Sequence, residues 1–188
     1  MQYLAVLTHI VETGENITKK QTGDILKIEG KKYVVVEEKE KDKVLVMNTE
    51  NARTGAFYFD AFYNKVRPDG QYSNTYENSD ADKYLENTWY KGLSAKMQNA
   101  IQPSNIKQVS YGSNTISRHV FLPSAEEIEM IVDTENLEKV KAFLHNNHNG
   151  AWTRDSSSYN PQYALGLEFR DYGSNHWSGI TSDSAHYN

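Results

Sequence analysis

Short runs of apolar residues in the first quarter of the chain predict antiparallel strands. Residues 3–11 gather Leu, Val, Ile and Thr before a turn at Thr13 and Gly14. Three further runs, separated by turns at 29–30 and 41–42, predict a meander over 25–28, 32–37 and 44–48. The first strand pairs either within the domain or across subunits. We therefore divide the chain into an N-terminal strand or arm, 1–22, and a domain, 23–188.

Helical spacing of apolar residues begins after Ser79. Ser79 is a suitable N-cap with Asp82 at the third helical position. The spacing predicts that one face of this helix is buried, with Ala81, Tyr84, Leu85, Thr88 and Trp89 on it. A second helical piece is expected over 94–101, before Pro103.

The stretch "ISRHVFLPSAEEIEMIV" predicts a strand followed directly by a helix. The strand is expected over 118–122 and breaks at Pro123, after which Ser124 and Glu127 form a capping box. Another helix is predicted over 135–144. Upstream, the aromatic region 49–75 is expected to be mostly loop, with a short strand near Phe57 and a turn at "RPDG", residues 67–70.

The last forty residues alternate strand-like pieces with loops of Ser, Tyr, Asn, Asp and Gly. The strands are predicted over 151–154, 163–169 and 176–180. We expect Trp152 and Phe169 to be buried and Tyr159, Tyr172 and Trp177 to be exposed. The whole pattern predicts an α+β fold with short antiparallel sheets, two to four helices and long loops.

The net charge and the absence of cysteine exclude several classes of binding partner and of chemical site. The chain has 188 residues, a net charge of −5 and no cysteine. No basic run is present that would favour nucleic acid or an anionic membrane, and disulfides, thiolate metal sites and cysteine nucleophiles are excluded. The N-terminus lacks the basic region and cleavage site of a signal peptide. We expect no partner of the nucleic-acid or membrane class.

Motifs for catalysis are absent from the sequence. It contains no nucleophile elbow, phosphate-binding loop, zinc-protease motif or EF-hand loop. His145 and His148 are close in sequence, but a polar helix end explains them better than a metal site. We therefore expect no catalytic residue, no metal and no cofactor.

The composition of the C-terminal region is typical of recognition loops, in which Tyr and Trp give contact area and small polar residues give hydrogen bonds. The candidate ligand-binding residues are Arg154, Tyr159, Tyr163, Tyr172, Asn175, His176, Trp177 and Tyr187.

Four stretches of the chain resemble one domain family. They are "GDILKIEGKKYVVVEEKEKDKVLVMN", "SDADKYLENTWYKGLSAKMQNAI", "RHVFLPSAEEIEMI" and "GAWTRDSSSYNPQYALGLEF". Their order and motifs resemble an uncharacterised domain common in Gram-positive bacteria and their phages. That resemblance implies a C-type-lectin-like fold, similar to that of formylglycine-generating enzymes, with a ligand face near the C-terminus.

Three departures limit what the resemblance implies. The cysteines of formylglycine-generating enzymes and the calcium-binding signatures of C-type lectins are absent. The strand on which family members commonly end is also missing, so residues 3–11 or a partner chain are expected to take its place, unless the chain is truncated.

These features together predict a non-enzymatic surface protein of a phage or phage-like virion, a capsid or tail accessory protein. Its expected partners are neighbouring virion subunits or a host-surface glycan or protein, within an oligomer or larger assembly. One alternative is a bacterial cell-surface adhesion module that binds glycan or protein. A second is a glycan-active hydrolase whose carboxylates converge only in space.

Overall fold

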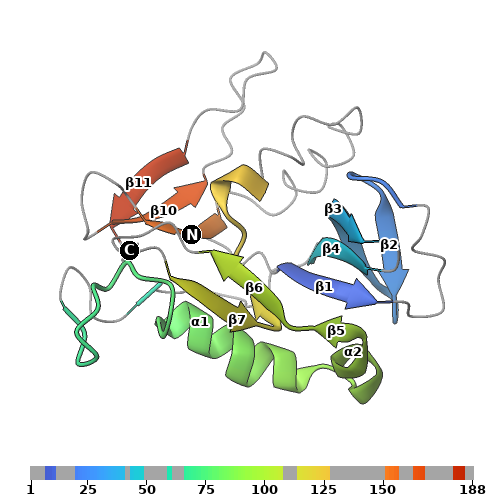
Figure 1. Cartoon of the computed structure of the whole chain (residues 1–188), viewed down its shortest axis with the longest axis horizontal. Coiled ribbons are helices and arrows are strands. Elements are labelled where there is room, and N and C mark those ends of the chain that lie inside the picture. Colours follow the sequence, from blue (N-terminus) through green and yellow to red (C-terminus); the bar gives the residue numbers. More distant parts are fainter. Residues whose placement is uncertain are drawn as a thin grey trace, which may run out of the picture.

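The described residues of the computed structural model form three antiparallel sheets, a helical segment over residues 80–100 and the start of another helix at residues 125–127 (Figure 1). This arrangement of short sheets with few helices confirms the predicted α+β class. The structure describes residues 7–11, 20–40, 43–48, 59–60, 66–107, 114–127, 151–156, 163–167 and 180–184. Of these, it describes only the backbone for residues 7–11, 38–40, 151, 163–167 and 180–184.

The largest sheet combines strands from residues 7–48 with strands from residues 101–121. Its strands are β1 (Leu7–Val11), β2 (Ile25–Ile28), β3 (Lys31–Glu40), β4 (Lys43–Asn48), β5 (Ile101–Gln102) and β8 (Val120–Phe121). The order is β2-β3-β4-β1-β5, and β8 also pairs with β1. The predicted meander is thus confirmed as β2-β3-β4. Of the two pairings that the sequence left open for the first strand, β1 adopts the one within the chain.

The core lies on the central strands of this sheet. Residues 33–36 of β3 and 44–48 of β4 are buried without alternation, which is the pattern of strands covered on both faces. Leu45 and Val46 are fully buried. At the start of β3, Glu29 and Gly30 form the predicted turn, and both have positive φ angles.

The helical segment changes its type along its length. It consists of α1 (Asp80–Tyr84), the π-helix η2 (Leu85–Trp89), the 3-10 turn η3 (Tyr90–Gly92) and α2 (Ala95–Ala100). Ser79 and Ser94 accept hydrogen bonds from Asp82 N and Met97 N, so the predicted cap at Ser79 is confirmed. The predicted burial of Thr88 is wrong, since Thr88 is exposed. A π-helix has more residues per turn than the 3.6 on which the prediction rests.

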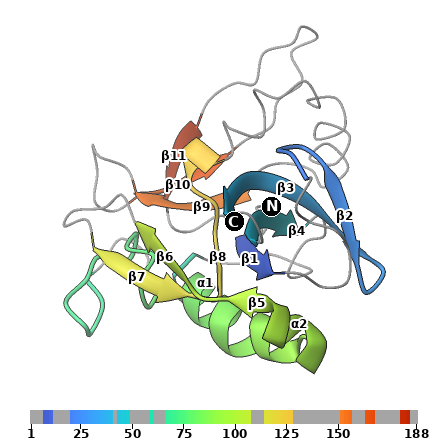
Figure 2. The same ribbon diagram turned by 45° about the vertical axis from the view of Figure 1, so that its right-hand side comes forward.

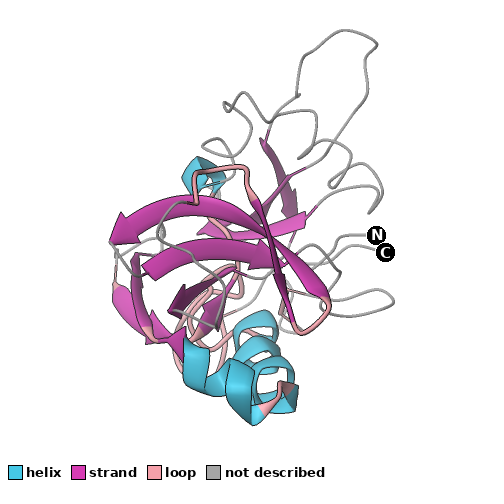
Figure 3. Ribbon diagram, turned by 90° about the vertical axis from the view of Figure 1, so that its right-hand side faces the viewer, coloured by secondary structure: helices cyan, strands magenta, loops and turns pink. Residues whose placement is uncertain are grey.

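Two smaller sheets complete the described fold. One is the hairpin of β6 (Ser104–Lys107) and β7 (Thr115–Arg118). The other, the terminal sheet, has the order β11-β10-β9 and consists of β9 (Ala151–Ser156), β10 (Tyr163–Leu167) and β11 (Ile180–Ser184). In Figures 1 and 2 the β6–β7 hairpin lies between the terminal sheet and the helical segment. Figure 3 shows most of the helical turns below the strands and one short turn above them.

Several predicted boundaries differ from those observed. The strand predicted over 118–122 is interrupted at His119, which separates β7 from β8. The last strand occupies Ile180–Ser184, so it begins where the predicted range 176–180 ended. Polar Ser and Asp residues obscure this strand in the sequence. The predicted helix over 135–144, the strand near Phe57 and the burial of Phe169 lie outside the described residues.

The predicted turn at 67–70 is present, and both backbone hydrogen bonds and the buried Arg67 side chain stabilise it. Arg67 N donates to Gln71 O and Gly70, at φ +81°, donates to Arg67 O. The Arg67 side chain is buried and donates to Asp60 Oδ2 at 3.1 Å and to Glu77 O at 2.6 Å. None of the described helices has the length and apolar character needed to cross a membrane.

Candidate functional site

Two of the predicted binding residues lie on described strands of the terminal sheet. Arg154 lies on β9, and Tyr163 is the first residue of β10, where the structure describes the backbone alone. The other six lie outside the described residues, namely Tyr159, Tyr172, Asn175, His176, Trp177 and Tyr187. The same holds for the predicted exposure of Tyr159, Tyr172 and Trp177, which stays a prediction.

The two segments that contain most of the predicted binding residues, 157–162 and 168–179, are attached at opposite ends of the terminal sheet. β9, β10 and β11 are successive antiparallel neighbours, with Ala164 opposite Ser156 at one end and Leu167 opposite both Ala151 and Ile180 at the other. The segment 157–162, which contains Tyr159, is therefore attached at the first end, where Tyr163 also pairs with Ser184. The segment 168–179 is attached at the second end. The sequence alone did not reveal this separation.

β9 carries a bulge at the centre of the terminal sheet. Between Ala164 and Gly166 of β10 the facing residue on β9 moves from Ser156 to Trp152, so β9 has two more residues than its partner over this interval. A bulge breaks the regular alternation of side chains and redirects them. This explains why residues 152–156 are all buried although most of them are polar.

Arg154 lies within this bulge and binds three residues outside the terminal sheet. Its guanidinium donates to Lys107 O at 3.0 Å, to Leu122 O at 2.9 Å and to both carboxylate oxygens of Glu127. It also lies over the Phe121 ring, with 5.5 Å between Cζ and the ring centroid. In this structure Arg154, one of the predicted ligand-binding residues, joins the terminal sheet to the body of the protein.

Asp155 makes a second connection between β9 and the segment 122–127. Its Oδ2 accepts a hydrogen bond from Ala125 N at 2.8 Å, while its buried Oδ1 accepts none from any residue that the structure describes. Burial raises the pKa of this carboxyl, and the charges of Glu127 and Glu126 act in the same direction. The hydrogen bond from Ala125 and the charge of Arg154 oppose that shift.

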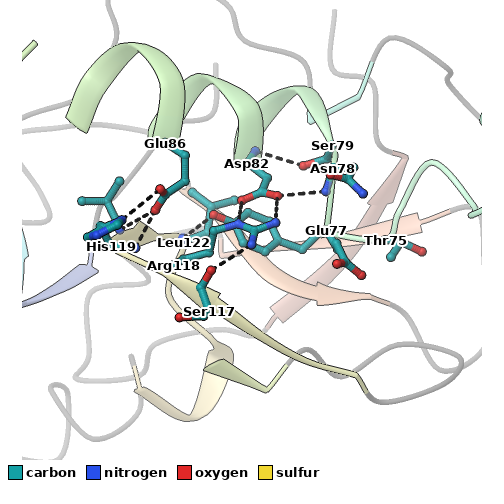
Figure 4. A network of polar contacts seen from close by, with 12 residues as sticks. Thr75, Glu77, Asn78, Ser79, Asp82, Glu86, Ser117, Arg118, His119 and Leu122 are labelled. Atoms are coloured by element: carbon teal, nitrogen blue, oxygen red, sulfur yellow. Dashed lines mark hydrogen bonds and ion pairs between the residues drawn. The ribbon is translucent and has the colours of Figure 1, made fainter. Parts of the chain in front are cut away.

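A second polar network connects the helical segment to the β7–β8 turn (Figure 4). Arg118 binds both oxygens of the buried Asp82, at 2.7 Å each. Asp82 Oδ2 also accepts from Asn78 N at 2.8 Å. The paired Asp82 raises the pKa of Arg118, mainly through their hydrogen bonds. This bidentate pair fixes the start of α1 against β7.

The π-helix places Glu86 beside His119. Glu86 Oε1 accepts from the backbone N–H groups of His119 and Val120 at 2.6 and 3.0 Å, and Oε2 lies 3.3 Å from His119 Nδ1 (Figure 4). The Tyr90 ring stacks on the imidazole, with ring centroids 4.5 Å apart. Sequence reasoning missed this group because 33 residues separate Glu86 from His119. The π-helical turn, which re-aims Glu86, has no sequence signal of its own.

Hydrogen bonds within the protein occupy the carboxylates of both polar networks. Asp82 binds Arg118, Glu86 accepts from backbone N–H groups, and Glu127 binds Arg154. Asp155 has the raised pKa that a general acid needs, but it is only 6% exposed. Within the described ranges no three His, Asp or Glu residues are arranged to hold a metal ion. Asp82, Glu86 and Glu127 therefore act as internal structural partners.

Comparison with known proteins gives one result. No curated protein and no solved structure matches the chain. A protein-family model with the description "Domain of unknown function (DUF6273)" matches residues 38–179, which is more than half of the chain. The matched range includes both polar networks and runs from β3 to the connection before β11. The chain therefore belongs to this DUF6273 family of domains of unknown function.

Proposed function

We propose that this protein is a non-enzymatic recognition module whose terminal sheet holds the ligand-binding segments. The observation that carries the proposal is the buried connection of β9 to the body through Arg154 and Asp155. It fixes the end of β9 from which the segment 157–162 starts, and β9 in turn pairs with β10, from which the segment 168–179 starts. Binding residues are commonly placed on such segments, held by a rigid scaffold.

The composition of the two segments supports this function. Residues 157–162 read "SSYNPQ" and residues 168–179 read "EFRDYGSNHWSG". Tyr and Trp bury large surfaces at little conformational cost, and Ser and Asn adapt their hydrogen bonds to a ligand. A glycan or a protein surface suits this combination. We propose that the two segments form a ligand-binding face like that of C-type-lectin-like domains, as the sequence resemblance implies.

The proposed location is the surface of a phage or phage-like particle. The resemblance of the chain to a domain of Gram-positive bacteria and their phages supports this location, and a capsid or tail accessory role follows from it. The partner would then be a host-surface glycan or protein or a neighbouring subunit. A bacterial cell-surface adhesion module would use the same segments. The hydrolase alternative gains no support from Asp82, Glu86 and Glu127, whose carboxylates have internal partners.

An array experiment tests the recognition role. The purified chain is applied to a glycan array, and the double variant Tyr172→Ala/Trp177→Ala is compared with Tyr72→Ala. Tyr72 is the matched control because it is an exposed tyrosine of the described part of the chain, outside the terminal sheet. We expect binding to fall at least about tenfold in the double variant, because loss of one or two contact aromatics costs this much at a recognition surface, and to be unchanged in the control.

Two results would contradict the proposal. Equal binding by the double variant and the wild type would remove these aromatics from the site, provided that both proteins unfold at the same temperature. Turnover of a glycan that depends on a single Asp or Glu would establish an enzyme. The location is tested separately, by mass spectrometry of purified particles and by inspection of neighbouring genes for capsid and tail proteins. A secretion signal encoded upstream of Met1 would favour the cell surface.

A further inference from the structure

Besides the packing of Trp152 on Phe59 in the core, the terminal sheet meets the rest of the protein at a polar junction, which we call the β9 junction. It consists of Arg154 and Asp155 on β9 and the segment 122–127. Arg154 N donates to Pro123 O at 2.9 Å, the Arg154 side chain bonds Leu122 O and Glu127, and Asp155 accepts from Ala125 N. The junction therefore contributes directly to the attachment of the terminal sheet.

The charges of the β9 junction do not balance. Arg154 and Glu127 neutralise each other through two hydrogen bonds between their side chains, which are 7% and 12% exposed. Asp155 is left with one backbone donor at Oδ2, and no described group donates to Oδ1. Glu126, which is exposed on the same segment, adds a further negative charge.

A buried carboxylate in this position has a specific physical difficulty. Burying an ionised oxygen without a hydrogen-bond donor costs free energy, and neutralising the group removes most of that cost. A metal ion could also neutralise it, but the described residues offer no group of three ligands. A proton needs no such group. The raised pKa of Asp155 agrees with this view.

We propose that the β9 junction is a pH-sensitive switch in which protonation of Asp155 strengthens, and ionisation weakens, the attachment of the terminal sheet to segment 122–127. The groups that act on Asp155 are Arg154 on its own strand and Glu126 and Glu127 on the facing segment. The inference goes beyond the proposed function and does not rest on it, because it concerns the attachment of the sheet and not the ligand.

The sign of the effect follows from proton linkage. The attached state holds the Asp155 proton more tightly than an opened state, in which the carboxyl is solvated and has its ordinary pKa. The contribution of the proton is fully present below that ordinary pKa and is lost as pH rises through the higher pKa of the attached state. One titrating group changes the opening equilibrium by up to about tenfold per pH unit in this interval.

Hydrogen exchange measured by mass spectrometry tests the switch. Protection factors of peptides covering β9 are recorded between about pH 4 and 8, and peptides from β3 and β4 of the same sample serve as an internal control. We expect β9 protection to fall as pH rises in the wild type, while that of β3 and β4 stays constant. In Asp155→Asn, which cannot ionise, we expect constant β9 protection over this range.

A second variant keeps the proposal testable if Asp155→Asn folds poorly. Glu126→Gln alters an exposed side chain and removes one negative charge that acts on Asp155. The fall in β9 protection should then occur at lower pH than in the wild type. The proposal is overturned if wild-type β9 protection is independent of pH, if Asp155→Asn keeps the wild-type profile, or if β9 and β3 lose protection together, which would mean global unfolding.

Discussion

Three arginines connect separate segments of the chain: Arg67 within ten residues of itself, Arg118 and Arg154 across 27 residues or more. Arg67, Arg118 and Arg154 each bind a carboxylate and at least one backbone carbonyl. The planar guanidinium suits this task because it presents several donors in a fixed geometry. Each arginine therefore joins its strand or turn to a carboxylate on another segment.

The first prediction concerns the pair of Arg118 and Asp82. Replacing Arg118 by Met leaves the buried Asp82 without its main counter-charge, and we expect the free energy of unfolding to fall by about 3 kcal/mol. Replacing it by Lys retains the charge but not the bidentate geometry, so the loss should be smaller. Urea unfolding of both variants measures the difference. A loss in Arg118→Met equal to that in Arg118→Lys would contradict the role assigned to the charge.

Residue-level prediction from the sequence succeeds where the interaction is local. Ser79 and Asp82 are three residues apart, and so are Ser124 and Glu127, and both predicted caps form. The pairing of Arg118 with Asp82 spans 36 residues, and no local pattern encodes it. Burial of Trp152 was predicted from its place in a strand and is confirmed. The unusual position of Arg154 within a buried strand was the available signal for an internal partner.

At the scale of elements, Glu127 serves two structures at once. Its Oε2 accepts from Ser124 N, as expected of a capping box, and its carboxylate binds Arg154 of β9. One side chain thus connects the start of a helix to the terminal sheet. The sequence predicted the first role, because it is local, and not the second, because 27 residues separate Glu127 from Arg154.

This double role gives the second prediction. Ser124→Ala removes a cap and should cost about 1 kcal/mol. Glu127→Ala also leaves the buried Arg154 without its counter-charge, so we expect a loss of about 3 kcal/mol. Thermal and urea unfolding of the two variants compare these losses. If the two variants were equally stable, the Arg154 contact would contribute nothing beyond the cap.

At the scale of the whole molecule, β1 is an internal strand of the largest sheet. It pairs with β4 along one side and with β5 and β8 along the other. Its backbone hydrogen bonds therefore join the N-terminal meander to the middle of the chain. The sequence predicted the strand, but two of its three partners, β5 and β8, lie more than ninety residues further along the chain.

The third prediction follows from this position. Deletion of residues 1–11 should abolish the folded state, because both neighbours of β1 lose their backbone partners and the sheet is divided. Deletion of residues 1–6, which leaves β1 intact, is the matched control. Circular dichroism and amide NMR spectra distinguish the two. A folded protein after deletion of 1–11 would show that the strand is dispensable.

The pairing of β1 also has a consequence for protein synthesis. β1 is translated before β5 and β8, yet Leu7 pairs with Phe121 and His9 with Gln102. β4 can pair with one side of β1 soon after synthesis, whereas the partners of the other side follow about a hundred residues later. That side of β1 stays unpaired in the interval, and exposed strand edges of nascent chains are sites of aggregation and of chaperone binding. Translation speed between the codons of β1 and those of β8 is thus expected to influence the yield of folded protein.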